Sequence, residues 1–131
     1  MRINVITIFP EIFDILNVGV ISKSLKNKII KLDIRDLRKN ASNKHNNIDS
    51  KPYGGGEGMV MMAEPIVKTL KQIKKKERGP VIFMSPQGEK LDQKKVKSFS
   101  KLKNITIICG RYEGIDLSLI THLTLPTMIG V

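Results

Sequence analysis

The sequence contains very little cysteine, with the single residue Cys109 in 131. One cysteine cannot form an internal disulfide or supply a cysteine-based metal cluster. Long hydrophobic runs are also absent, because no apolar stretch approaches the roughly 20 residues that span a bilayer. The first residues alternate in hydropathy and are followed at once by acidic residues, which is not the pattern of a signal peptide. We therefore expect a cytoplasmic protein without a membrane partner.

Acidic residues are scarce relative to basic ones. There are 23 Lys and Arg residues against 12 Asp and Glu residues, a formal net charge of +11. A positive charge of this size favours a polyanionic partner such as RNA, DNA or an anionic membrane. A genome rich in A and T would also favour Lys, Ile and Asn codons, so both explanations stay open. The lysine-rich segment at 71–79 is typical of the solvated end of a helix.

The chain is long enough for one domain, and 40% of its residues are hydrophobic. Strands are predicted where apolar and β-branched residues concentrate, at Ile3–Phe9, Lys31–Leu37, Gly79–Ser85 and Asn104–Gly110. Helices are predicted between them from apolar spacing, at 10–16, 20–30, 62–76 and toward the end of 86–102. This alternation predicts an α/β fold with a mostly parallel sheet flanked by helices, in which the first, third and fourth strands are adjacent.

Two of the predicted strands end in small or turn-forming residues. Ser85–Gly88 follows one strand, and Gly110–Gly114 follows the other. Ligands of open α/β sheets bind beyond the carboxyl ends of the strands, so these two loops predict a site lined by backbone groups. Ordinary strand-to-helix turns would give the same pattern.

The stretch Lys51–Met62 contains four glycines within five residues, followed by a methionine-rich segment. It lacks the Gly-Lys-Ser/Thr ending of a P-loop and does not directly follow a strand, so it is not a nucleotide fingerprint. Together with the preceding lysines, Asp49 and Tyr53, it suits a nucleic acid. A flexible surface loop is the alternative.

Single reactive side chains give weaker indications of function than these segments do. His45 and His122 lack a spaced set of partners, so no metal site is predicted, and His45 is expected to be a solvated polar residue. Cys109 ends an apolar strand and is expected to be an inert thiol. Glu113, between two glycines, can fix a cationic ligand group, unless it forms an ion pair with Arg111.

Four strings occur in order and together resemble the bacterial tRNA (guanine-N1)-methyltransferase family, TrmD: ITIFPEIFD, KPYGGGEGMVMM, FMSPQGEKLDQ and IICGRYEGID. The resemblance covers roughly residues 1–120. It implies a SPOUT-class α/β fold with a trefoil knot, a homodimer, and S-adenosylmethionine as methyl donor. The implied reaction methylates N1 of the guanosine at position 37 of tRNA, next to the anticodon, so the expected nucleic acid partner is tRNA and not DNA.

The resemblance also implies roles for residues at matching positions. The donor would lie against two loops, with Glu113 near its methionine part; their residues are Met84, Ser85, Pro86, Gly88, Gly110, Tyr112, Glu113 and Gly114. The RNA would meet a second set, which comprises Asp49, Gly54, Gly55, Gly56, Gly58 and Arg111. No residue of this chain matches the family's general base, so no catalytic residue is assigned.

Departures from the family pattern set further expectations. Asn46 stands where an arginine is usual, and Ser50 where a second acid is usual. We expect residues 1–120 to form the N-terminal methyltransferase domain and residues 121–131 to be a divergent tail, with the family's C-terminal domain absent and the knot incomplete. This chain alone is therefore expected to be inactive. The alternative is a non-catalytic basic domain that binds RNA.

Overall fold

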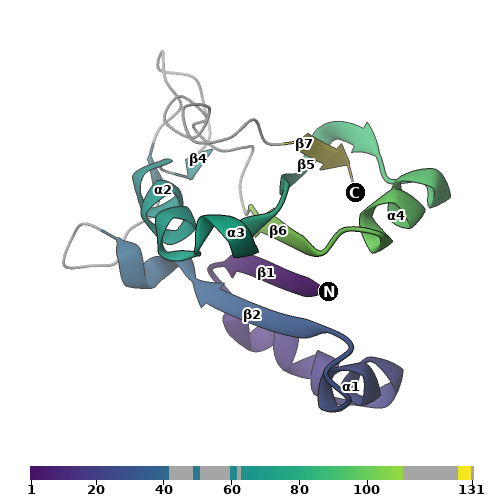
Figure 1. The fold of residues 1–131 in the computed structure, drawn as a ribbon. Coiled ribbons are helices and arrows are strands. Elements are labelled where there is room, and N and C mark those ends of the chain that lie inside the picture. The colour runs from purple at the N-terminus through teal and green to yellow at the C-terminus, as the bar shows by residue number, and fades with distance from the viewer. Residues whose placement is uncertain (42–48, 51–59, 62, 111–126, 131) are drawn as a thin grey trace.

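The computed structural model describes residues 1–41, 49–50, 60–61, 63–110 and 127–130, and Figure 1 shows their arrangement. In the first half of the chain the elements are β1 (Arg2–Thr7), the 3-10 helix η1 (Pro10–Asn17), α1 (Gly19–Lys26), β2 (Lys31–Asp36), the 3-10 helix η2 (Leu37–Asn40), β3 (Asp49–Ser50) and β4 (Val60–Met61). In the second half they are α2 (Ala63–Gln72), α3 (Lys75–Arg78), β5 (Val81–Lys90), α4 (Gln93–Ser100), β6 (Asn104–Cys109) and β7 (Thr127–Gly130).

The main sheet has five strands in the order β2-β1-β6-β5-β7, and every pairing in it is parallel. Strands β3 and β4 form a separate antiparallel pair. The three strands expected to be adjacent are β1, β6 and β5, which lie side by side at the centre of the sheet (Figure 1). The predicted α/β fold with a mostly parallel sheet is therefore confirmed.

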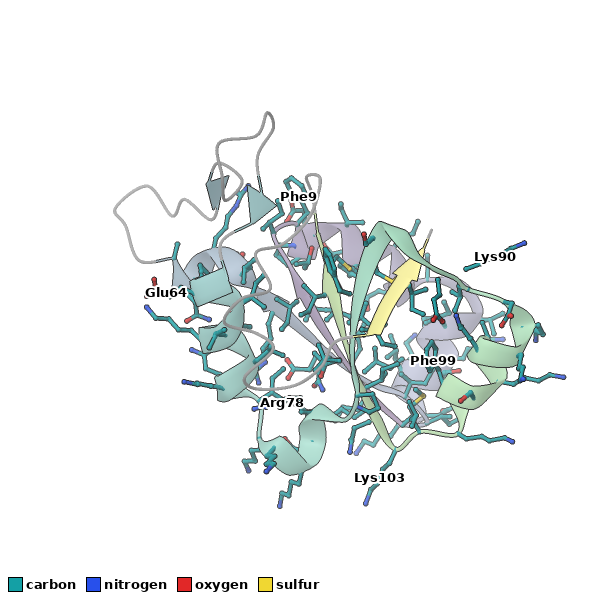
Figure 2. The ribbon with its side chains drawn as sticks, turned by 90° about the horizontal axis from the view of Figure 1, so that it is seen from above. Phe9, Glu64, Arg78, Lys90, Phe99 and Lys103 are labelled. Carbon is teal, nitrogen blue, oxygen red and sulfur yellow. The ribbon has the colours of Figure 1, made fainter. Side chains whose placement is uncertain are left out.

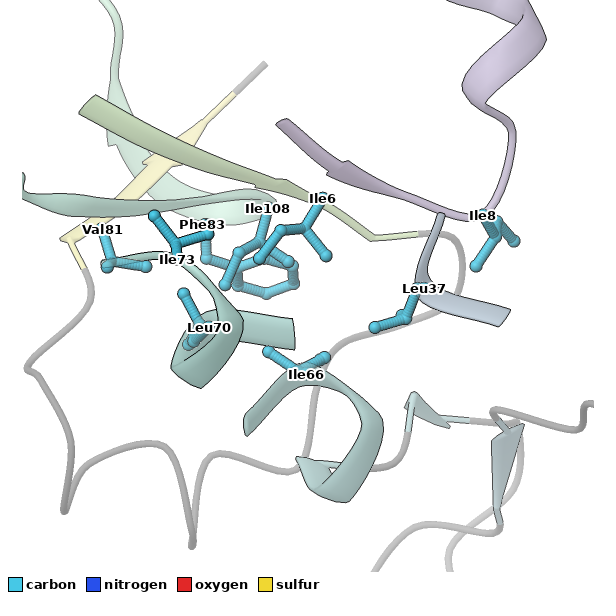
Figure 3. Close-up of a cluster of buried hydrophobic side chains, with 9 residues drawn as sticks. All are labelled: Ile6, Ile8, Leu37, Ile66, Leu70, Ile73, Val81, Phe83 and Ile108. Carbon is cyan, nitrogen blue, oxygen red and sulfur yellow. The ribbon is translucent and has the colours of Figure 1, made fainter. Parts of the chain in front are cut away.

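Alternate side chains of β5 enter different cores on the two faces of the sheet. Val81 and Phe83 join a cluster with Ile66 and Leu70 of α2 and with Ile73, which directly follows that helix (Figure 3). Ile82 joins a second cluster on the opposite face, where Phe99 of α4 packs. Successive side chains of a strand point to opposite faces of the sheet. A parallel strand that is covered on both faces therefore needs apolar residues on both of its sides.

The helices differ from expectation in their boundaries. Pro10 begins a 3-10 helix rather than an α-helix. Helix α1 ends at Lys26, before the expected Ile30, because Lys28 has a φ of +58°, a left-handed conformation that no α-helix continues. The expected helix over 62–76 is divided into α2, which ends at Gln72, and the separate short helix α3.

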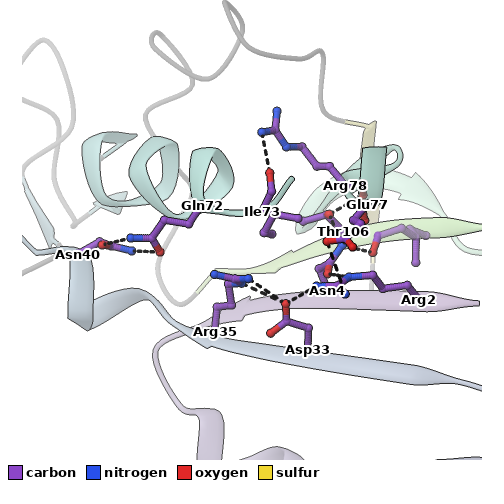
Figure 4. A network of polar contacts seen from close by, with 11 residues as sticks. Arg2, Asn4, Asp33, Arg35, Asn40, Gln72, Ile73, Glu77, Arg78 and Thr106 are labelled. Carbon is purple, nitrogen blue, oxygen red and sulfur yellow. Dashed lines mark hydrogen bonds and ion pairs between the residues drawn. The ribbon is translucent and has the colours of Figure 1, made fainter. Parts of the chain in front are cut away.

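A pair of amide side chains fixes η2 against α2. Asn40 Nδ2 donates to Oε1 of Gln72 at 3.2 Å, and Gln72 Nε2 donates back to Oδ1 of Asn40 at 3.0 Å (Figure 4). Asn40 Nδ2 also lies 2.8 Å from the hydroxyl oxygen of Thr69, which is buried. Leu37 of the same short helix is fully buried in the first core, so η2 is held by both apolar and polar contacts.

We expect Leu70→Ala to destabilise the protein by about 2–5 kcal/mol, because the fully buried side chain would leave a cavity between α2 and the sheet. The neighbouring exposed Lys71→Ala is the control and should stay within about 0.5 kcal/mol. Urea unfolding followed by circular dichroism measures both. Equal effects of the two substitutions would contradict the placement of α2.

Candidate functional site

The pairing of β5 with β6 stops at the carboxyl end of β6, within β5. Met84 of β5 is opposite Cys109 of β6 in the parallel register, so the next residues along the two strands, Ser85 and Gly110, leave the paired region at the same edge. The sequence pattern predicted that the two loops begin next to each other, and the described residues have this arrangement. A ligand at this edge would meet backbone groups from both strands.

The segment Ser85–Gly88 was expected to be a loop, and that expectation is wrong as to its secondary structure. Strand β5 continues to Lys90, because β7, which the sequence did not predict, pairs with it on both sides of the segment. The pairing itself is interrupted: Ile129 of β7 is the partner of both Met84 and Glu89. The four residues between them therefore form an irregularity in the strand, where a proline without an N–H is tolerated.

The residues around the start of this irregularity differ in their exposure to solvent. Ser85 is only 2% exposed, whereas Gly110 across the register is exposed. Met84 is half-buried and packs against the second core. Of Ser85 and Gly110, therefore, the exposed Gly110 is the one whose main chain a ligand at this edge could reach directly.

A cavity of about 330 Å³ opens beside this edge, at the carboxyl ends of β1 and β6. Its lining is mainly apolar and comprises Thr7, Ile8, Phe9, Ile12, Phe13, Cys109 and Gly110. Of these, sequence reasoning assigned a site role to Gly110 alone. The string ITIFPEIFD, which was used only for the family resemblance, contains the other lining residues apart from Cys109 and could have indicated them.

Cys109 lines that cavity as a half-buried thiol. Burial raises its pKa above the ordinary value, because the thiolate is poorly solvated there. A raised pKa lowers the fraction of the reactive thiolate near neutral pH. The geometry thus agrees with an inert thiol rather than a nucleophile.

Many of the predicted site residues lie outside the described part of the chain. They are Gly54, Gly55, Gly56, Gly58, Arg111, Tyr112, Glu113 and Gly114. Asp49 belongs to β3 and pairs with Met61 of β4. In the sequence, β3 precedes the glycine stretch and β4 follows it. Pro86 and Gly88 lie in the interrupted part of β5. The knot expected from the resemblance also involves residues outside the described ranges.

The described residues give no sign of a metal site or of a membrane-spanning helix. They contain no group of three or more His, Cys, Asp or Glu side chains placed to hold a metal ion. None of their helices has the length and apolar character needed to cross a membrane.

Comparison with known proteins identifies the family. A sequence model of the tRNA (guanine-1)-methyltransferase TrmD family matches residues 1–130. The chain belongs to this family. A tRNA (guanine-N(1)-)-methyltransferase from Clostridium botulinum (strain Alaska E43 / Type E3) is 41% identical over 99% of the chain, and one from Buchnera aphidicola is 46% identical over all of it.

A solved structure agrees with these relatives. The crystal structure of tRNA (m1G37) methyltransferase from Aquifex aeolicus superposes with a TM-score of 0.83 and 35% identity, covering 98% of this chain and 59% of that one. The chain spans about half the length of the curated relatives it matches, 55% and 54% for the two named above. The family match runs to residue 130 and therefore includes β7, whereas the quoted motifs end near residue 120.

We predict that Cys109 reacts with iodoacetamide several-fold more slowly in the folded protein than after unfolding. Burial raises the thiol pKa, so the folded protein holds less thiolate at a given pH near neutrality, and its alkylation should need a higher pH. Mass spectrometry of timed, quenched reactions over a pH series gives the rates. Alkylation at the rate of the unfolded chain would show that the thiol is accessible and active.

Proposed function

We propose that this chain carries part of the donor and RNA sites of a tRNA (guanine-N1)-methyltransferase. The enzyme would transfer a methyl group from S-adenosylmethionine to N1 of guanosine 37 in tRNA, in the cytoplasm. The observation that carries the proposal is the placement of Ser85 and Gly110 next to each other at the carboxyl edge of the sheet. Membership of the family gives this edge its chemistry.

The donor would be held by the two strand ends and the residues that follow them. Ser85 and the interrupted part of β5 would lie on one side, and Gly110 with Tyr112, Glu113 and Gly114 on the other. The donor supplies an electrophilic methyl group on a sulfonium, and the protein's task is to orient it. Glu113 would balance the positive charge of the donor's methionine part, since opposite charges attract strongly where water is excluded.

The target nucleotide would be met by the segment that includes Asp49 and Gly54–Gly58, together with Arg111. Glycines allow a close approach of the backbone to a base, and an arginine can bind a phosphate through two hydrogen bonds. N1 of guanine carries a proton that a base must accept as the new bond forms. No residue of this chain is assigned that role.

The test of the donor site is alanine substitution of Glu113 in a full-length relative, at the equivalent position. We expect donor affinity or turnover to fall at least about tenfold, or about 1.4 kcal/mol, because the carboxylate's charge would be lost. Calorimetry with S-adenosylmethionine and radiolabelled methyl incorporation into unmodified tRNA measure the two quantities.

Alanine at the position equivalent to Glu64 is the matched control, since that side chain is exposed on α2 and pairs with Lys68. It should leave both quantities unchanged. Donor binding and turnover that are both undiminished in the Glu113 variant would refute the assignment. If calorimetry on this chain itself detected no donor binding, the chain would instead fit a basic domain that binds RNA without catalysis.

We further propose that the family's homodimer forms through η1 and α1. These helices bury almost nothing within the chain: η1 has no buried residue, and α1 buries Ser22 alone. Their apolar side chains instead face outward, with Ile15 71% and Val20 80% exposed. Beside them is a hollow of about 430 Å³ between η1, α1 and β2, which Phe13 and Ile34 help to line.

The charges on this surface favour a second copy of the same chain. Helix η1 begins next to the carboxyl edge of the sheet and carries Glu11 and Asp14, whereas α1 ends near the amino edge and carries Lys23 and Lys26. A two-fold axis between the helices would place the acids of each copy against the lysines of the other. Protruding side chains and an adjacent hollow on one surface are also what a self-complementary interface needs.

We expect Ile15→Lys to convert a dimer into a monomer, because two added charges would be buried at the two-fold interface. Sedimentation velocity over a range of concentrations measures the assembly state. Val96→Lys on α4 is the control, since Val96 is also exposed and lies on a different surface. Dimerisation that survives Ile15→Lys would place the interface elsewhere.

A further inference from the structure

Lysines gather at the amino edge of the sheet, opposite the candidate donor site. Lys75 and Lys76 belong to α3, which precedes β5, and Lys101 and Lys103 precede β6. Because β5 and β6 are parallel neighbours, the segments that enter them lie at the same edge. Figure 2 shows Lys103 extending from this edge beside the helix that carries Arg78.

The backbone of α3 is fixed to the sheet by polar side chains. Asn104 Nδ2 donates to the carbonyl oxygen of Lys76 at 3.0 Å, and Asn4 Nδ2 donates to that of Glu77 at 2.9 Å. The hydroxyl of Thr106 donates to the carbonyl oxygen of Arg78 at 2.6 Å (Figure 4). Three successive carbonyl groups at the end of this four-residue helix therefore have side-chain partners.

This anchoring is unusual for a helix so short. A single turn is unstable in water on its own, because ordering its backbone costs more than its few hydrogen bonds return. Asn4 and Thr106 are both fully buried, and buried polar groups destabilise a protein unless they are hydrogen-bonded. Two buried polar side chains of the sheet thus hold in place a helix whose lysine side chains are exposed.

The turn after α3 is equally constrained. Gly79 has a φ of +63°, and a Cβ atom at this position would lie 2.1 Å from the carbonyl oxygen of Asn104. Next to it, the N–H of Thr106 donates to the carbonyl oxygen of Pro80 at 2.9 Å, and the N–H of Arg2 donates to that of Lys103 at 2.9 Å. Both lysine-bearing segments therefore have a fixed backbone.

The lysines of this edge have no acidic partner among the described ion pairs. Elsewhere Lys68 pairs with Glu64 and Lys95 with Glu89, but the nearby Glu77 faces Arg2 at 3.7 Å instead. Lys75, Lys76, Lys101 and Lys103 are all exposed. A fixed array of cations without neutralising acids is a surface suited to a polyanion.

We propose that this amino-edge surface, formed by Lys75, Lys76, Lys101 and Lys103, binds the phosphodiester backbone of the RNA substrate away from the reacting nucleotide. That the polyanion is RNA rests on the proposed function. The surface carries no aromatic side chain, so it can contact phosphates but cannot stack on bases. Its contribution is therefore independent of RNA sequence and falls with salt.

The test compares two triple variants with the same net charge. The surface variant is Lys75→Gln, Lys76→Gln and Lys103→Gln; the control is Lys71→Gln, Lys94→Gln and Lys97→Gln, which removes exposed lysines from α2 and α4. The probe is an unmodified tRNA transcript, and fluorescence anisotropy over a series of KCl concentrations gives the affinity. Thermal melting checks that both variants remain folded, as expected for exposed side chains.

We expect the surface variant to bind tRNA at least about tenfold more weakly at low salt. Its slope of log affinity against log salt should be shallower by about 2. Each lost phosphate contact reduces the magnitude of this slope by about 0.7 to 0.9, and the variant lacks three lysines. The control should change both quantities by much less. Equal losses in the two variants would overturn the proposal, because the effect would then follow net charge and not the surface.

Two further measurements distinguish this proposal from binding to a membrane and from the proposed donor site. Unchanged tRNA binding, with binding to phosphatidylserine vesicles lost in the surface variant alone, would overturn it in favour of a membrane. Calorimetry with S-adenosylmethionine is independent of this edge and should be the same in both variants. Absence of donor binding in the unsubstituted chain would count against the proposed function, whereas a tRNA effect confined to the surface variant would still support this surface.

Discussion

The parallel pairing of β5 with β6 is the constraint on which the rest of the molecule depends. It places Met84 opposite Cys109, so that Ser85 and Gly110 emerge together at one edge, and it places the segments before Val81 and Asn104 together at the other. Parallel strands need a long crossover connection, and α4 supplies it while covering the second core. A slip by one residue would exchange the two faces of β5 and move Val81 and Phe83 from the first core to the face of the second.

The second constraint is polar and lies within the same sheet. Asn4 reaches the carbonyl oxygen of Glu77 and lies 3.1 Å from the hydroxyl oxygen of Thr106, while it accepts a hydrogen bond from Arg2 Nε at 2.8 Å. Arg2 also forms an ion pair with Asp33 of β2 at 2.7 Å. One network therefore joins β2, β1, β6 and α3, and its removal would leave buried polar groups without partners, which is costly.

The sequence predicted the central strands because their signal is local. Val81–Met84 is an uninterrupted apolar run, and Ile105–Cys109 is apolar and β-branched apart from Thr106 and Cys109, which is the composition expected of strands covered on both faces. It also predicted that Ser85 and Gly110 would share an edge, because this follows from parallel pairing alone. It did not predict β7: Thr127–Gly130 is short and becomes a strand only through its pairing with β5.

Other features depended on partners far away in the sequence. The apolar spacing predicted helices near η1 and α1 but not which of their side chains are covered. Ile15 and Val20 are exposed, because spacing does not say whether a covering surface exists within the chain. The lysine-rich segment was expected to be the solvated end of a helix. This segment is anchored in part by Asn4, which donates to the carbonyl oxygen of Glu77, 73 residues away in the sequence. Nothing in the sequence near a polar residue of a strand indicates a partner so far along the chain.

The separation of the two edges also limits what can bind to both of them. Strand β6 has six residues, so the edges are roughly 20 Å apart at about 3.3 Å per residue. A methyl donor is too small to reach across that distance, so lysines at the amino edge cannot act on it by direct contact. Their charges would also be strongly screened at this distance in physiological salt. An RNA is long enough to contact both edges. Under the two proposals, charge at the amino edge would contribute to how firmly the RNA is held, while the chemistry at the carboxyl edge would depend on separate residues.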